Sequence, residues 1–397
     1  MSSLYVISAV AKDQPGLAHR ISQALSDMNI NIVDIDARSV RGHFSMFLVV
    51  DLSTSTFSYD EMMERMSPIE SKFELGLHVE PYEAGRRNPS KELMILTVMG
   101  HDRPGIVASV SQICAKNSVN IESIRMIARG NYIAMELSLD GSDLDDMALL
   151  REEYYAFSEE TGLDVSLRDE DLFNKPKRVV IFDCDSTLVQ GEVIDEMAEI
   201  AGVGARVKDV TARAMNGEID FVQAIKERIR LLKGLTRTQL ESIFDTVHLT
   251  PGAEDLIATL HFMGYKVAVV SGGFSFFTDY LKDRLNLDYV FANELEIKNG
   301  VVTGEIKGRI IDAQSKADIL NEIAERENIS PDQIVAVGDG ANDRFMLQNA
   351  GLAIAFNPKD ALKKYSNGML SNDNLSGLLY FLGIPDAQME KIKNGGT

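Results

Sequence analysis

Acidic and hydroxyl residues end three apolar segments in the second half of the sequence. Asp183 and Asp185 end RVVIFDCDST, Ser271 ends YKVAVVS, and Asp339 follows DQIVAVG. Continuous apolar runs that alternate with helical segments are typical of a parallel sheet buried on both faces. Because sites in such sheets form at the carboxyl ends of strands, we expect these residues to converge in one cleft.

Clustered carboxylates in this half indicate a metal site. Asp183, Asp185, Asp339 and Asp343 would repel one another without a cation. The two cysteines and six histidines show no metal-ligand spacing, so oxygen-only ligation favours Mg²⁺. A carboxylate can also attack phosphorus and form an aspartyl-phosphate. The charge of the transferred group would then lie beside Mg²⁺, Lys316 and backbone amides.

The elements around these segments complete the predicted core. The segment Ser271–Gly273 is expected to open a helix whose N–H groups bind phosphate. A mostly helical block covers about residues 193–247, and Asn299-Gly300 between alternating runs predicts a hairpin. We therefore expect an α/β fold with a Rossmann-like parallel sheet and an inserted helical cap.

Residues 178–385 resemble the haloacid dehalogenase superfamily and, within it, the phosphoserine phosphatases. The four motifs of that superfamily occur in order: DCDST, Ser271 in SGG, Lys316, and GDGAND at 338–343. A lone D-x-D is a weak signal, whereas four ordered motifs at strand ends are specific.

The resemblance implies a role for each matching residue. Asp183 is the nucleophile, and Asp185 is the general acid that later acts as base. The metal is held by Asp183, Asp339 and the backbone carbonyl of Asp185, with Asp343 acting through a water molecule. The residues implied to bind phosphate are Ser271, Gly272, Lys316 and Asn342.

The resemblance also implies O-phosphoserine as substrate. The stretch TARAMNGEIDF (211–221) closely matches the cap of phosphoserine phosphatases. Arg228 would bind the carboxylate and Glu192 the ammonium, while Met215 and Phe221 pack the aliphatic part. By pattern alone, Arg228 in IKERIRLL favours a solvated helix face, and Met215 and Phe221 favour a core role.

The first half contains an internal repeat. Residues 4–50 match 93–139 at one fixed offset without a gap, which places Asp102 against Asp13 and Asn120 against Asn31. Each copy is predicted to have the order βαββαβ, a ferredoxin-like unit. Residues 84–91 are interpreted as the linker between the copies.

Residues 4–170 resemble tandem ACT domains, which are small amino-acid-sensing modules. The resemblance implies a regulatory ligand, with serine as the candidate, at Gly16 and Asn31 and at Gly105 and Asn120. It also implies a homodimer formed through ACT sheets. The alternative is that D-x-P-G is only a tight turn and that each Asn only caps a strand.

Length and composition set the remaining expectations. A chain of 397 residues allows two to four domains, and we expect ACT domains at 1–84 and 91–170 and a phosphatase domain at 177–397. A net charge of −20 argues against nucleic-acid or anionic membrane partners. Without a signal peptide or a transmembrane stretch, a cytoplasmic protein is expected.

Three functions stay open at this point. The first is hydrolysis of O-phosphoserine, the last step of serine biosynthesis, controlled by serine at the ACT domains. The second is phosphoryl transfer to another alcohol such as homoserine, or hydrolysis of another small phosphate. The third is an amino-acid-sensing regulatory protein, which the intact Asp183, Asp185, Lys316 and Asp339 argue against.

Overall fold

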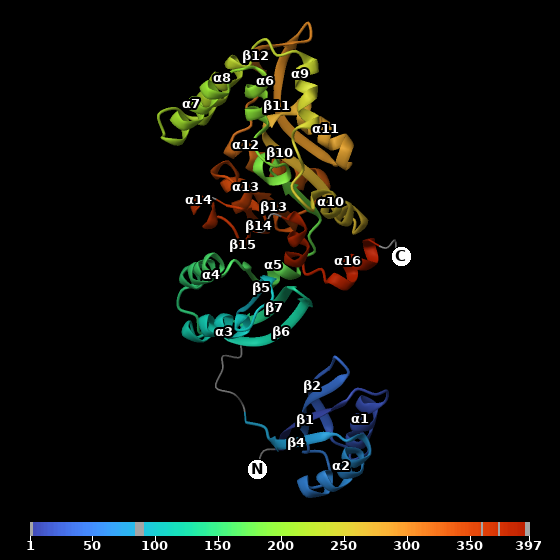
Figure 1. Ribbon diagram of the computed structural model, residues 1–397. Coiled ribbons are helices and arrows are strands. Elements are labelled where there is room, and N and C mark those ends of the chain that lie inside the picture. The colour runs from blue at the N-terminus through green and yellow to red at the C-terminus, as the bar shows by residue number, and fades with distance from the viewer. Residues whose placement is uncertain (1–2, 84–90, 359, 372–373, 394–397) are drawn as a thin grey trace. The chain divides into compact units, whose positions relative to one another are not determined.

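The computed structural model describes residues 3–83, 91–358, 360–371 and 374–393 (Figure 1). The chain divides into two compact units, residues 1–89 and 90–397. Apart from Lys91, the expected linker at 84–91 lies outside the described residues. Within the described ranges, every helix is too short or too polar to cross a membrane.

The first unit is a βαββαβ module with an antiparallel sheet in the order β2-β3-β1-β4. Leu17, Ile21 and Leu25 recur every four residues on α1 and are buried against this sheet, as expected for an amphipathic helix. The elements are β1 (Leu4–Lys12), α1 (Leu17–Asp27), β2 (Asn31–Val40), β3 (His43–Asp51), α2 (Tyr59–Phe73) and β4 (Gly76–Pro81).

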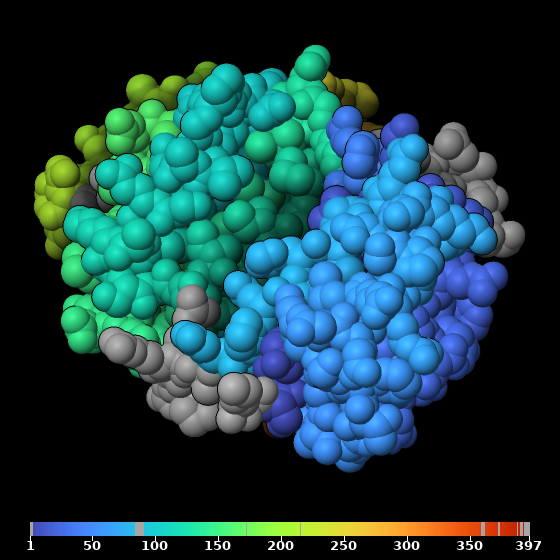
Figure 2. All heavy atoms as spheres, turned by 90° about the horizontal axis from the view of Figure 1, so that it is seen from below, coloured from blue at the N-terminus to red at the C-terminus, as the bar shows by residue number. Residues whose placement is uncertain are grey.

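The second unit begins with a second module of the same order, whose atoms are mostly teal in Figure 2. Gly16 and Gly105 precede the first helix of each module with φ of 95° and 96°, a conformation that favours glycine. The elements are β5 (Leu93–His101), α3 (Ile106–Lys116), β6 (Asn120–Ala128), β7 (Tyr132–Asp140), α4 (Met147–Thr161) and β8 (Asp164–Asp169), followed by α5 (Glu170–Asn174).

The catalytic core is the parallel sheet predicted from the apolar runs. Its parallel strands lie in the order β11-β10-β9-β13-β14-β15, and β12 adds the antiparallel arm of a hairpin. The strands are β9 (Val179–Phe182), β10 (Lys266–Phe274), β11 (Tyr289–Lys298), β12 (Val301–Lys307), β13 (Ile334–Gly338), β14 (Leu352–Phe356) and β15 (Gly368–Leu370). The helices are α10 (Ala253–Phe262), α11 (Ser275–Leu285), α12 (Ala313–Glu327), α13 (Arg344–Asn349), α14 (Asp360–Lys363), α15 (Leu378–Phe381) and α16 (Asp386–Lys393).

A helical insertion follows the first core strand, as the sequence predicts. The chain leaves β9 through a short turn (Cys184–Leu188) and returns to the core at α10. Asp220 caps the insertion helix Phe221–Leu231 by accepting a hydrogen bond from the Gln223 N–H at 2.7 Å. The insertion contains α6 (Val193–Ile200), α7 (Gly204–Met215), α8 (Phe221–Leu231), α9 (Arg237–Glu241) and a 3₁₀ turn (Ser242–Asp245).

The second module and the catalytic core share one 11-stranded sheet. Strand β15 pairs antiparallel with β8, with Gly368 opposite Ser166. A Cβ at position 368 would lie 2.7 Å from the Ser166 Cβ, so this contact requires glycine. The second module is therefore built into the catalytic unit.

The fold class is confirmed, and one local expectation is wrong. Ser271–Gly273 do not open a helix, because β10 continues to Phe274 and α11 begins at Ser275. The Asn299-Gly300 hairpin is present, with φ of 53° and 76° at its turn, as a type I′ turn requires.

Candidate active site

The carboxyl ends of β9, β10 and β13 line one side of a pocket of about 430 Å³, and residues of the cap helices line its other side. It brings together predicted residues from both the core and the cap. They are Asp183, Asp185, Glu192, Phe221, Arg228, Gly272, Asp339 and Asn342. Ser271, Lys316 and Asp343 are buried at the base of this site and do not line the pocket.

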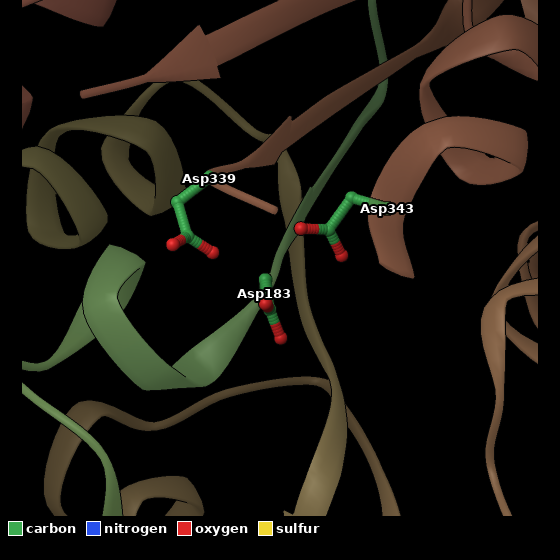
Figure 3. A group of neighbouring side chains, drawn as sticks. All are labelled: Asp183, Asp339 and Asp343. Carbon is green, nitrogen blue, oxygen red and sulfur yellow. The ribbon is translucent and has the colours of Figure 1, made fainter. Parts of the chain in front are cut away.

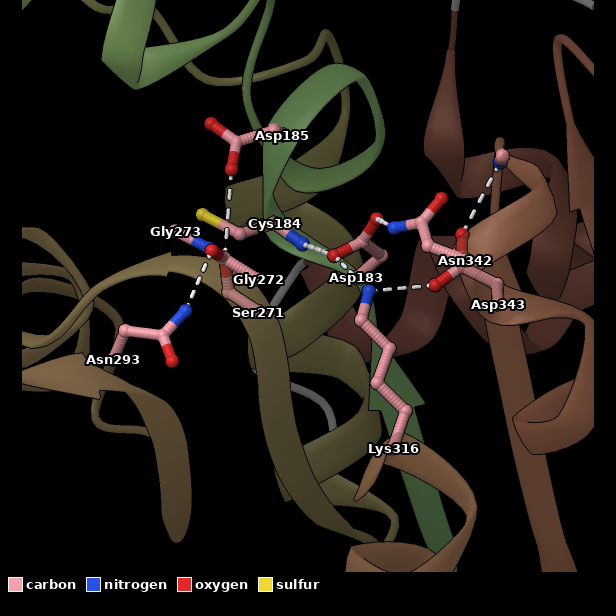
Figure 4. A network of polar contacts seen from close by, with 11 residues as sticks. Asp183, Cys184, Asp185, Ser271, Gly272, Gly273, Asn293, Lys316, Asn342 and Asp343 are labelled. Carbon is pink, nitrogen blue, oxygen red and sulfur yellow. Dashed lines mark hydrogen bonds and ion pairs between the residues drawn. The ribbon is translucent and has the colours of Figure 1, made fainter. Parts of the chain in front are cut away.

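A buried lysine joins two carboxylates at the pocket base. The Lys316 Nζ lies 2.6 Å from Oδ1 of both Asp183 and Asp343, and all three side chains are almost fully buried (Figure 4). Burial opposes the ammonium charge, but the two carboxylates outweigh it and raise the pKa of Lys316. Asp183 also accepts hydrogen bonds from the Cys184 N–H at 2.7 Å and the Asn342 Nδ2 at 3.5 Å.

Three carboxylates could hold a metal ion. One oxygen from each of Asp183, Asp339 and Asp343 lies within 4.8 Å of the other two, and Figure 3 shows Asp339 and Asp343 turned toward Asp183. An oxygen-only donor set suits a hard divalent cation. Gly338 makes room for this group, because a Cβ there would lie 2.5 Å from the Asp343 carboxylate.

Asp185 is set for proton transfer. A turn with Ser186 at φ 57° follows it, and its Oδ1 accepts a hydrogen bond from the Val193 N–H at 2.8 Å. Burial, followed by the negative charge of Glu192, raises the pKa of Asp185 to about 8. A raised pKa favours the protonated form of the carboxyl group and suits a side chain that acts as an acid.

Small residues bring the end of β10 close to Asp185. The Gly273 N–H donates to the Ser271 Oγ at 2.8 Å, and the Ser271 Oγ donates to the Asp185 Oδ2 at 3.4 Å. A Cβ at position 273 would lie 2.9 Å from that carboxylate oxygen. Glycine at position 273 therefore allows the end of β10 to lie close to the Asp185 carboxylate.

The cap contributes a cation and an anion to the same pocket. Arg228 on α8 and Glu192 before α6 both line it. The Arg228 Nε is buried without a hydrogen-bond partner among the described residues. Burial lowers the pKa of Arg228, opposed by the charge of Glu192. A planar guanidinium in this setting suits a carboxylate ligand. Phe221 also lines the pocket, whereas the side chain of Met215 lies outside those the structure describes.

Some pocket residues were not singled out from the sequence. They are Ile194, Thr211, Ala214, Ala224, Ile225, Phe274, Gly340 and Ala341. Thr211 and Ala214 lie in the cap stretch TARAM and Gly340 and Ala341 in GDGAND, so the motifs contained the signal. Small residues carry no chemistry of their own that would separate pocket lining from packing.

The candidate regulatory residues do not come together within one module. Asn31 pairs with Asp51, which also pairs with Leu4 at the start of β1, whereas Gly16 follows the end of β1. Gly105 and Asn120 have the same arrangement in the second module. The two residues of each pair therefore lie toward opposite ends of the first strand of their module.

Comparison with known proteins supplies the context for this geometry. A haloacid dehalogenase-like hydrolase family matches residues 177–351, and ACT domain families match residues 5–70 and 92–168. The chain is 46% identical over 351 residues to a phosphoserine phosphatase of Archaeoglobus fulgidus, covering 88% of this chain and 100% of the relative.

Two further relatives are also named phosphoserine phosphatases. A phosphoserine phosphatase of Streptomyces coelicolor is 34% identical over 395 residues, covering 97% of this chain and 93% of the relative. The crystal structure of a probable phosphoserine phosphatase from Vibrio cholerae is 34% identical, covers 75% of this chain and 88% of its own, and has a TM-score of 0.58.

Proposed function

The chain belongs to the phosphoserine phosphatase family, and from this premise we propose that it hydrolyses O-phospho-L-serine to L-serine and phosphate. The observation that carries the proposal is one pocket with two chemically distinct ends. Asp183 and Lys316 at the base suit a phosphoryl group, and Arg228 and Glu192 in the cap suit the carboxylate and ammonium of an amino acid.

Asp183 is the proposed nucleophile. Its carboxylate attacks phosphorus, the bond from phosphorus to the serine oxygen breaks, and Asp185 donates its proton to that oxygen. Asp185 then accepts a proton from water as the water attacks the aspartyl-phosphate, which releases phosphate and restores Asp183. The raised pKa of Asp185 supports the first of these roles.

Asp183, Asp339 and the backbone carbonyl of Asp185 are proposed to hold Mg²⁺, with Asp343 acting through water. The all-oxygen donor set supports this assignment. When bound, Mg²⁺ would neutralise charge on the phosphoryl oxygens. Lys316, Asn342, Ser271 and the Gly272 backbone would bind the remaining phosphoryl oxygens.

Arg228 is proposed to bind the substrate carboxylate and Glu192 its ammonium, while Phe221 and Met215 pack the carbon atoms between them. The buried Nε of Arg228 supports this role.

The ACT modules, with proposed bounds of 1–84 and 91–170, are proposed to bind serine and to form a homodimer. The proposed phosphatase domain covers 177–397. Edge strand β2 leaves Val33 and Ile35 55% and 52% exposed, which supports pairing with a second copy. Gly16 of one copy and Asn31 of the other would then complete a ligand site. Gly105 of one copy and Asn120 of the other would do the same.

Phosphate release from phosphoserine tests the function, the metal and the substrate together. We expect release with Mg²⁺, none after chelation with EDTA, and recovery when Mg²⁺ is restored. Phosphothreonine and glycerol phosphate serve as comparison substrates, and labelled phosphoserine with added homoserine detects transfer. Preference for another phosphate, or for transfer over hydrolysis, would contradict the proposal.

The effect of serine on the rate tests the regulatory sites. Gly16→Ala and Gly105→Ala force an L side chain into a left-handed conformation with open space around it. We expect at least one of them to weaken the effect of serine while turnover without serine stays within about twofold. Gly264→Ala has the same strain in the catalytic core and is the control. An unchanged serine response in both ACT variants would count against these sites.

A further inference from the structure

The carboxyl end of β10, which is proposed to bind phosphate, is a bulge in the sheet. Val270 pairs with Phe291, and the next pair joins Phe274 to Asn293. Ser271–Gly273 thus lie opposite a single residue of β11, and their backbone groups leave the regular strand ladder. Buried backbone groups in this position need other partners.

The side chain of Asn293 supplies such a partner. Asn293 is fully buried on β11, and its Nδ2 donates to the Gly272 carbonyl oxygen at 2.7 Å. Figure 4 shows this amide pointing at the bulge. Its Oδ1 accepts a hydrogen bond from the Ile311 N–H at 2.8 Å. Donor and acceptor are therefore both engaged with backbone of other segments.

These two bonds join the two parts of the site that are proposed to bind phosphate. Ile311 directly precedes Asp312, the residue that caps α12 by accepting a hydrogen bond from the Ser315 N–H at 2.8 Å. Helix α12 carries Lys316. One amide thus connects the Gly272 bulge to the start of the helix that presents the lysine.

The orientation of one peptide follows from these contacts. Peptide bonds here are trans, so the Gly272 carbonyl and the Gly273 N–H point in opposite directions. With the carbonyl held by Asn293, the Gly273 N–H is directed toward the Ser271 Oγ, which donates to Asp185. The chain of hydrogen bonds runs from a buried amide outside the pocket to the proposed general acid.

We propose that Asn293 is a positioning residue for phosphoryl transfer, which fixes the Gly272–Gly273 peptide and the Ser271 hydroxyl against the phosphoryl group. This inference rests on the proposed function. Asn293 does not line the pocket, so it acts through the bulge and through α12. A side chain that served only the stability of the sheet would not change phosphate affinity.

Two substitutions at this position separate the possibilities. Asn293→Asp keeps the acceptor for Ile311 but places an oxygen against the Gly272 carbonyl, and Asn293→Ser shortens the side chain without adding charge. Asn367→Asp is the matched control, because the Asn367 Oδ1 accepts a hydrogen bond from the Ala353 N–H at 2.9 Å in the same sheet, and Asn367 does not line the pocket.

Each full-length variant is measured in three ways with Mg²⁺ present. Thermal unfolding reports folding, phosphoserine kinetics report kcat and KM, and calorimetry reports the Kd of inorganic phosphate. We expect both Asn293 variants to lose about 10- to 100-fold in kcat, as for other groups that orient a site, and to bind inorganic phosphate about tenfold more weakly. In Asn367→Asp, kcat and the Kd of inorganic phosphate should stay within about twofold of the wild-type values, even where its loss of thermal stability is comparable to that of the Asn293 variants.

Two results would overturn the proposal. If either Asn293 variant folds and keeps kcat and phosphate affinity within twofold, Asn293 does not position the site. If Asn293→Asp does not fold, Asn293→Ser decides, and if neither folds, the role is in folding and the proposal is wrong. Failure of the wild-type protein to hydrolyse phosphoserine would contradict the proposed function alone, because phosphate binding still tests Asn293.

Discussion

Attraction of an anionic substrate to this site depends on individual side chains that act at short range. The protein carries a net charge of −20, yet its proposed substrate is an anion, so the overall field gives no attraction. Lys316 between Asp183 and Asp343, Arg228 in the cap and the carboxylates that could hold a cation must supply it locally. The residues on which affinity depends are therefore few and individually testable.

Arg228 offers the sharpest test at this scale. Arg228→Lys keeps the charge but removes the planar, bidentate donor group. A hydrogen bond to a charged group contributes about 1.5–3 kcal/mol, so kcat/KM for phosphoserine should fall about 10- to 100-fold. Phosphoethanolamine lacks the carboxylate, and its kcat/KM should not change.

Arg230→Lys is the control for this prediction. Arg230 lies on the same helix with a side chain that is 64% exposed, so its substitution should affect neither substrate. Equal losses for phosphoserine and phosphoethanolamine in Arg228→Lys would show that Arg228 does not bind the carboxylate.

At the scale of elements, a hairpin fixes the helix that carries Arg228. The β11–β12 hairpin meets the end of α8, where the Gly234 N–H donates to the Val302 carbonyl at 2.9 Å and the Val302 N–H donates to the Leu235 carbonyl at 2.8 Å. Gly304 makes the approach possible, because a Cβ there would lie 3.3 Å from the Arg230 Cα. Backbone contact of this kind sets the distance between hairpin and cap.

Alanine substitutions at two glycines of this hairpin region test the contact. Gly304 and Gly308 have φ of 91° and 76°, but a Cβ at position 308 meets nothing within 4 Å. Alanine at position 308 should cost about 1 kcal/mol of unfolding free energy through backbone strain. Alanine at position 304 should cost about 1–3 kcal/mol more, because its Cβ would lie too close to the Arg230 Cα. Only Gly304→Ala should also raise KM. Equal costs in urea unfolding would show that α8 does not depend on the hairpin.

Local sequence patterns were sufficient for most elements near the site. Apolar runs predicted β9, β10 and β13, and the Asn299-Gly300 turn predicted the hairpin, because these signals involve neighbouring residues. The bulge at Ser271–Gly273 was missed, since small residues after a strand fit a helix start equally well. Its partner Asn293 is distant in sequence, and a single buried amide has no periodic signal.

At the scale of the whole molecule, the second module and the catalytic core are joined through one continuous sheet. The β8–β15 pair is supported by the Tyr155 hydroxyl, which donates to the Ser366 carbonyl at 2.7 Å, and by the Ser371 N–H, which donates to the Asp164 Oδ1 at 2.6 Å. The repeat suggested two equivalent modules. Because a three-residue strand such as β15 has almost no sequence signal, this difference between the modules could not be predicted.

Truncation tests this division. Removal of residues 1–89 deletes one compact unit, and the remainder should keep its phosphatase activity and unfold within about 2–4 °C of the full chain. Removal of residues 1–170 deletes β8 and exposes the edge of β15 and the apolar face beneath it. That protein should lose solubility or cooperative unfolding. Equal stability of the two truncations would contradict a structural role for the second module.

The proposed function depends on transfer of a phosphoryl group from serine to Asp183. The most direct measurement mixes the enzyme, Mg²⁺ and phosphoserine that carries a radiolabelled phosphate, quenches with acid, and locates the label in peptides. We predict label on Asp183 in the wild-type protein, none in Asp183→Asn, and turnover in that variant lower by about 1,000-fold or more with unchanged thermal unfolding. Undiminished turnover in Asp183→Asn, or label on another residue, would show that Asp183 is not the nucleophile.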